Sequence, residues 1–276
     1  ACVGAGLVNV LIMFKQRQQE KQQAHTAFRV WLRQLFKAFA VMGIIVAALQ
    51  LPLQAGALAE NGLVGMLNQI MLNIIWQSAI GTQSVIRIIG FIILLLVMKV
   101  RPQALQYIVG FVGALLIAYS FTLTGHTVQL ANWVQLALLL HLLAMAAWVG
   151  ALWPLYQSCV RLPSSSVLLL MRRFGQFAQA FVLVLLLCGG LLLWQLVGSV
   201  TLLFSSNYGQ LLLLKLLLVV GMLLLGAWHK FKLVVELASH QNTNLLRGSI
   251  LIETCLALLI LITTTIFTTF VGPEIA

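Results

Sequence analysis

Long apolar runs constrain this chain more than any other feature of its sequence. Residues 209–228, GQLLLLKLLLVVGMLLLGAW, contain a single charged side chain, Lys215. A run of about 18 apolar residues is long enough to cross a bilayer as a helix, and several such runs follow one another here. Hydrophobic residues make up 62% of the chain and charged residues 8%, with a mean hydropathy of +1.05. We therefore predict an all-α, polytopic membrane helical bundle.

The runs predict about eight transmembrane helices, and residues 1–276 are predicted to form a single transmembrane domain. The first run, ACVGAGLVNVLIMF, is too short for a full span and lacks the basic leader of a signal peptide. We expect it to be the second half of a helix whose start lies upstream. The expected spans lie at residues 1–14, 35–58, 82–99, 103–123, 132–158, 168–198, 209–231 and 247–271.

Basic residues are concentrated in every second connection between these runs. The net charge of +11 comes mainly from such connections, and basic residues flank membrane spans on the cytoplasmic side. This placement predicts a multi-pass membrane protein with both termini on the outer side, and it argues against a nucleic-acid partner. The segments predicted to be cytoplasmic are residues 15–34, 99–102, 159–173 and 230–247.

Residues 62–80, between the first two full spans, are amphipathic. Leu63, Leu67, Ile70 and Ile74 fall on one face of a helix, and asparagine and glutamine side chains fall elsewhere. This pattern predicts an interfacial helix lying on the outer surface of the membrane.

A histidine stands inside the fifth apolar run, in HLLAMAAWVGALWPL at 141–155. On a helix, His141, Met145 and Trp148 share one face. His126, in LTGHTVQ, ends the preceding span, so a short turn brings it near His141. Because imidazole and thioether groups suit copper, we predict a metal site of His126, His141 and Met145. The alternative is a solvated His126 and a His141 that hydrogen-bonds a neighbouring helix.

Three charged side chains fall within the predicted spans. Arg87 and Lys215 lie in the outer third, where each can extend its charge to the interface. Glu253 lies near the inner face. We favour a structural pair between Glu253 and a basic residue such as Arg173 or Lys230, with a proton or ion relay as the alternative.

The remaining polar residues give little support for catalysis. The chain has five acidic residues and carries no nucleotide-binding loop, HExxH or GxSxG motif, so we predict that it is not an enzyme. The four cysteines have no metal-binding spacing and are predicted to be small buried hydrophobes. His229, in AWHKFK, is predicted to be a residue of the membrane interface.

Several short blocks occur in an order that resembles a known family. GHT is followed by LHLLAMAAWVGALWPL, RRFGQFA and YGQLLLLKLLLV, and then by a glutamate in the last span. Over about residues 80–270 this order is similar to the CopD/PcoD copper resistance family of bacterial inner membrane proteins. One departure is Gly150-Ala151, where the family has two glycines, and we expect a slightly looser backbone approach there.

The resemblance implies an eight-helix membrane domain for copper handling, with copper transport or transfer as its function. It also implies a periplasmic copper-binding partner of the CopC type. The alternatives are a haem-binding electron-transfer protein and a non-transporting subunit of a membrane complex. By motif position, the resemblance directs functional interest to His126, His141, Trp148, Lys215 and Glu253.

Overall fold

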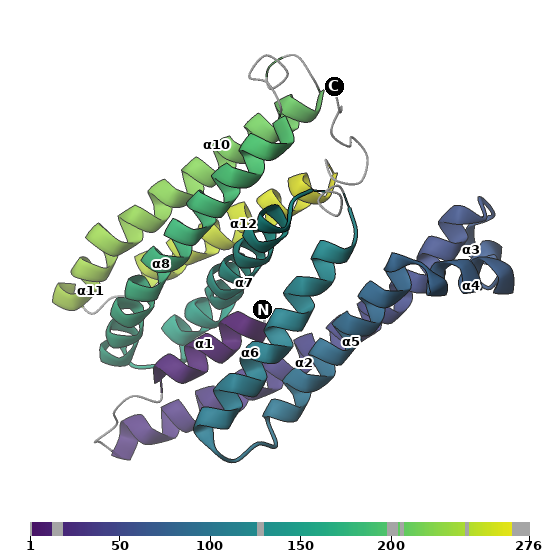
Figure 1. Ribbon diagram of the computed structural model, residues 1–276. Coiled ribbons are helices and arrows are strands. Elements are labelled where there is room, and N and C mark those ends of the chain that lie inside the picture. The colour runs from purple at the N-terminus through teal and green to yellow at the C-terminus, as the bar shows by residue number, and fades with distance from the viewer. Residues whose placement is uncertain are drawn as a thin grey trace. The chain divides into compact units, whose positions relative to one another are not determined.

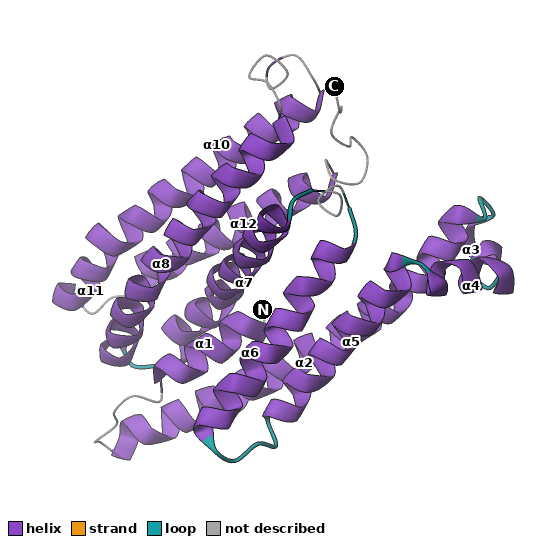
Figure 2. Ribbon diagram, in the orientation of Figure 1, coloured by secondary structure: helices purple, strands orange, loops and turns teal. Residues whose placement is uncertain are grey.

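Helices make up nearly all of the described chain in this computed structural model, which describes residues 2–12, 19–125, 130–197, 204, 207–240 and 243–266 (Figure 2). Within these ranges there is no strand, and seven helices are long and apolar enough to cross a membrane. The prediction of an all-α, polytopic membrane bundle is confirmed. The elements are α1 (Cys2–Ile12), α2 (Gln19–Leu58), α3 (Gly62–Gly65), α4 (Gln69–Gln77), α5 (Ala79–Val97), α6 (Gln103–Ser120), the 3₁₀ turn η1 (Phe121–Leu123), α7 (Asn132–Arg161), α8 (Ser164–Val197), α10 (Asn207–Trp228), the π-helix η2 (His229–Leu233), α11 (Val234–His240) and α12 (Asn244–Ile266).

The helices extend further than the predicted spans. Most of residues 15–34, predicted to be a loop, belongs to α2, which is 40 residues long. Most of residues 230–247 is also helical, because η2 and α11 continue α10. Glutamine, glutamate, lysine and alanine favour helix, and the stretch from 19 to 34 has no glycine or proline to stop it. The change from apolar to polar residues shows where the apolar spans end, but the helices continue beyond those points.

The segment 62–80 is not one helix. It contains α3, α4 and the start of α5, and polar caps separate these pieces. The Asn68 side chain accepts hydrogen bonds from two N–H groups in the first turn of α4, at 3.0 and 3.2 Å. The Ser78 hydroxyl oxygen accepts one from the first turn of α5 at 3.2 Å. Asparagine and serine are preferred at such positions because they satisfy N–H groups that have no partner within the helix.

The apolar side chains of this segment are exposed. Leu63, Leu67, Ile70 and Ile74 are each half or more exposed. Exposed apolar side chains of this kind suit a lipid surface, and the placement of the segment on the outer face of the membrane stays a prediction.

The chain divides into two compact units, each described by itself. The terminal unit comprises Val3–Leu32 and Ala144–Ala276, and the central unit comprises Arg33–Leu143 together with Cys2. The helices α2 and α7 each contribute one part to each unit. Their organisation as one domain stays a prediction.

In the central unit, α5 and α6 pack closely side by side (Figure 1). Glycines allow this approach: a Cβ atom on Gly90 would stand 3.0 Å from the carbonyl oxygen of Gly113, and the reverse distance is also 3.0 Å. Small residues are common where membrane helices cross, because they let the backbones meet. The shorter helix α4 packs against α5.

In the terminal unit, α10 packs against α12, and α1 meets the second half of α7. A Cβ atom on Gly4 would collide with the backbone of Gly150 and Ala151. The two backbones meet closely at Gly150-Ala151 because the α1 side carries a glycine, and an approach looser than in the family stays a prediction. The guanidinium of Arg173 donates to the carbonyl oxygen of Leu11 at 2.9 Å and so satisfies a group near the end of α1.

Candidate functional site

One face of α12 is buried over the first half of the helix and carries an acidic residue. Its buried residues are Leu246, Ser249, Ile250, Glu253 and Ala257. These positions recur every three or four residues, which is the spacing of one helical face. Glu253 is only 3% exposed, because it occupies a position on this face where the other large residues are apolar.

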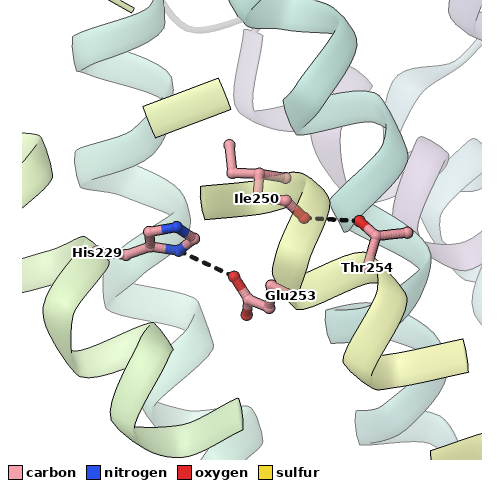
Figure 3. A network of polar contacts seen from close by, with 4 residues as sticks. All are labelled: His229, Ile250, Glu253 and Thr254. Carbon is pink, nitrogen blue, oxygen red and sulfur yellow. Dashed lines mark hydrogen bonds and ion pairs between the residues drawn. The ribbon is translucent and has the colours of Figure 1, made fainter. Parts of the chain in front are cut away.

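The partner of Glu253 comes from a π-helical turn at the end of α10. His229 is the first residue of η2, and its carbonyl oxygen accepts a hydrogen bond from the N–H of Val234, five residues on. Its ring nitrogen Nδ1 lies 2.9 Å from Oε2 of Glu253 (Figure 3). The two side chains are 12% and 4% exposed. Single π-turns inside α-helices are rare and occur often at functional sites.

The pair leaves one ring nitrogen of His229 available. A carboxylate only accepts hydrogen bonds when ionised, so we assign the proton of the neutral ring to Nδ1 and the lone pair to Nε2. Among the described residues, Nε2 is buried and has no hydrogen-bond partner. Thr254 does not compete for Glu253 in the close view, because its hydroxyl donates to the carbonyl oxygen of Ile250 at 2.8 Å (Figure 3).

Metal-binding histidines have this arrangement. Such a histidine usually donates its other N–H to a carboxylate, which fixes the tautomer and the ring orientation and makes the ligand nitrogen more basic. Nε2 of His229 is therefore prepared to bind a metal ion or to accept a proton. In such a site Glu253 would orient the ring and offset the charge of a bound cation.

A buried tryptophan and a buried serine lie near this part of α10 and α12. Trp148, 7% exposed, lies 3.9 Å from the place a Cβ atom on Gly226 would take, one turn before His229. Ser249 lies one turn before Glu253 and is 8% exposed, and its hydroxyl has no hydrogen-bond partner within the described ranges. The tryptophan thus packs against the helix that positions His229.

Sequence reasoning placed Glu253 inside the bundle but named the wrong partners. Arg173, one expected partner, donates to a backbone carbonyl of α1, and the ammonium of Lys230, the other, lies 5.4 Å from the centre of the Phe231 ring. Glu253 pairs with His229 instead, so His229 is not a simple interface residue. The sequence shows a histidine near the end of one span and a lone carboxylate at the beginning of another, but it does not show that these two helices pack together.

The predicted site of His126, His141 and Met145 stays a prediction. His126 lies outside the described residues, whereas His141 and Met145 are both partly buried on α7. In the part of the chain that the structure describes, no group of three or more His, Cys, Asp or Glu residues could hold a metal ion.

The two charged residues predicted for the outer third of the membrane are both partly buried. Lys215 lies on α10. Arg87 lies on α5 and makes hydrogen bonds to Gln50 and Ser120. Its guanidinium is therefore held by polar side chains of the central unit.

Comparison with known protein families identifies the chain. A model described as "Copper resistance protein D" matches residues 168–267, and one described as "Copper resistance protein D-like, N-terminal domain" matches residues 1–136. Comparison with curated proteins and with solved structures found no match. Glu253 and its partner lie in the first matched range and Arg87 lies in the second. The chain belongs to the copper resistance protein D family, a membership that supports a role in copper resistance.

Proposed function

We propose that this protein transfers copper ions through the membrane and that His229 is one of the ligands that bind the ion. The family match supports copper as the ion. The single observation that carries the assignment of the ligand is the buried Nε2 atom of His229, which has no hydrogen-bond partner among the described residues.

The chemistry of the pair suits copper. Neutral imidazole is a good ligand for copper ions. A monovalent copper ion beside the ionised carboxylate of Glu253 brings the net charge of the site to zero, which lowers the cost of holding the ion away from water. In the same site, Glu253 fixes the ring of His229 at a distance of 2.9 Å.

The small size of the pair suits transfer. Structural metal sites close around the ion with about four ligands. A transfer site must bind strongly enough to admit the ion and weakly enough to release it. One imidazole supported by one carboxylate meets both requirements better than a closed site does.

A second set of ligands is proposed for the opposite half of the membrane. His126, His141 and Met145 belong to segments that the pattern of basic residues assigns to the periplasmic side. There they capture copper from a periplasmic copper-binding protein of the CopC type, and the thioether of Met145 favours Cu(I). Trp148 packs beside the route and does not bind the ion, because an indole offers only a donor.

The test is copper uptake by sealed vesicles that contain the purified protein. Copper is offered outside with a weak chelator and a reductant, and the copper retained inside is measured over time. We expect His229→Gln and Glu253→Gln to lose most of the protein-dependent uptake. The matched controls are His25→Gln, a buried histidine that hydrogen-bonds Ser166 at 2.9 Å, and Glu60→Gln, an exposed carboxylate.

Two results would contradict the proposal. The first is normal uptake by a folded His229→Gln variant. The second is the absence of uptake by the wild-type protein together with a haem absorption band in the purified sample, which would support the electron-transfer alternative. The variants His126→Ala, His141→Ala and Met145→Leu test the outer ligands separately, and each is expected to slow uptake at low copper concentration.

A further inference from the structure

The central unit holds a partly buried positive charge that has no acidic partner among the described residues. Arg87 is partly buried on α5, and Glu60 is the only acidic residue between positions 33 and 143. Glu60 is exposed in the turn between α2 and α3. An arginine side chain stays charged in proteins. Glu60 is exposed, so the central unit has no buried acidic side chain that could neutralise this charge.

Neutral groups from three elements hold the guanidinium in place. Its Nε donates to the hydroxyl oxygen of Ser120 at 3.1 Å, and its Nη1 donates to Oε1 of Gln50 at 2.9 Å. The ring of Phe121 covers one face, with its centre 4.2 Å from Cζ. These contacts, together with the nearby C-terminal end of α6, orient the cation, but none of these side chains neutralises it.

Two buried polar atoms of α5 have no hydrogen-bond partner among the residues that the structure describes. Nη2 of Arg87 is buried and has no partner in the described part of the chain, and the same holds for the hydroxyl of Ser84, which is 0% exposed. Ser84 precedes Arg87 by three residues, so both lie on one face of the helix. Buried polar groups are nearly always hydrogen-bonded, so two such donors on one face indicate a missing acceptor.

We propose that Arg87 and Ser84 bind an anionic phosphate oxygen, supplied by a phospholipid headgroup or by free phosphate. A guanidinium held by its other nitrogens presents a fixed donor to an oxyanion, and the serine hydroxyl adds a second. Ser120, which contacts Arg87, is the last residue of α6, so the site lies beside a helix end as well as on α5.

The test uses the full chain, purified in a neutral detergent and stripped of lipid, and follows thermal unfolding. One arm adds inorganic phosphate, with sodium chloride at equal ionic strength as its control. The other arm adds phosphatidylglycerol, with diacylglycerol, which has no phosphate, as its control. We expect a saturable rise in the unfolding temperature of the wild-type protein with at least one phosphate compound. A response to phosphatidylglycerol alone identifies the headgroup, and a response to inorganic phosphate identifies the free ion.

The variants assign the effect to the site. Arg87→Gln should abolish the stabilisation, and Ser84→Ala should weaken the apparent affinity by about tenfold, as expected for one lost hydrogen bond to a charged group. Lys99→Gln, which removes an exposed charge just beyond α5, should respond as the wild type does. Should Arg87→Gln fail to fold, Arg87→Lys and Ser84→Ala still decide the matter, because both retain the charge. An unresponsive wild type, or wild-type affinity in Ser84→Ala and in a folded variant of Arg87, would overturn the proposal.

Discussion

Replacing Glu253 by glutamine is expected to destabilise the terminal unit measurably. The amide oxygen can still accept a hydrogen bond from Nδ1 of His229, so the shape of the pair is kept and the charge is lost. Hydrogen bonds to charged groups contribute about 1.5–3 kcal/mol and neutral ones about 0.5–1.5 kcal/mol. The difference is about 1–2 kcal/mol, which lowers the unfolding temperature by about 2–4 °C for a chain of this size. Glu253→Ala removes the acceptor altogether, and its expected cost is about 3–5 kcal/mol.

The assay is thermal unfolding of purified protein in detergent, with Glu60→Gln as the matched control. Glu60 is exposed, so its replacement should change stability by less than about 0.5 kcal/mol. A double-mutant cycle with His229→Gln isolates the pair, and the combined loss should be smaller than the sum of the single losses. Equal unfolding temperatures for the two glutamate variants, or strictly additive losses in the cycle, would refute the contact between Glu253 and His229.

Other predictions concern packing and topology. Gly4→Ala should lower the unfolding temperature, because the new methyl group would collide with backbone atoms. Gly175→Ala has open space around the new methyl group and should raise the unfolding temperature slightly, because alanine favours helix more than glycine does. The reverse order of the two unfolding temperatures would contradict the packing of α1. Gly90→Ala should destabilise the crossing of α5 and α6 more than Gly110→Ala does, because the new methyl group at position 110 makes only an ordinary van der Waals contact. Equal unfolding temperatures for these two variants would argue against that crossing. A cysteine introduced at Thr127 should react with a membrane-impermeant thiol reagent in intact spheroplasts, and labelling only after lysis would reverse the predicted orientation.

The fold class could be predicted from the sequence because apolar runs of bilayer length allow few alternatives to a helix. The helix ends could not be predicted in the same way. The polar stretch that begins at Gln19 has good helix formers and no breaker, so α2 continues past its apolar part. The segment 62–80 shows the opposite failure. Its apolar periodicity suggested one helix, but the capping side chains of Asn68 and Ser78 divide it.

Half of the candidate site was visible in the sequence. Glu253 was conspicuous because a carboxylate is costly in an apolar run. His229 was not conspicuous as its partner. Lys230 and Lys232 follow His229, and a lysine or arginine is the usual partner of a carboxylate. The pairing depends on the contact between α10 and α12 and on a π-turn, neither of which leaves a signal in the order of residues. The hydrogen bonds of Arg87 are likewise long-range contacts.

The most direct measurement is the Cu(I) affinity of the purified protein, determined by competition with a chromophoric chelator. The wild type is compared with His229→Gln, and His25→Gln serves as the control for a buried histidine outside the pair. We predict that His229→Gln weakens binding of one copper ion by at least about tenfold, equivalent to about 1.4 kcal/mol, while His25→Gln binds as the wild type does. Unchanged affinity in a folded His229→Gln variant would show that Nε2 of His229 is not a copper ligand.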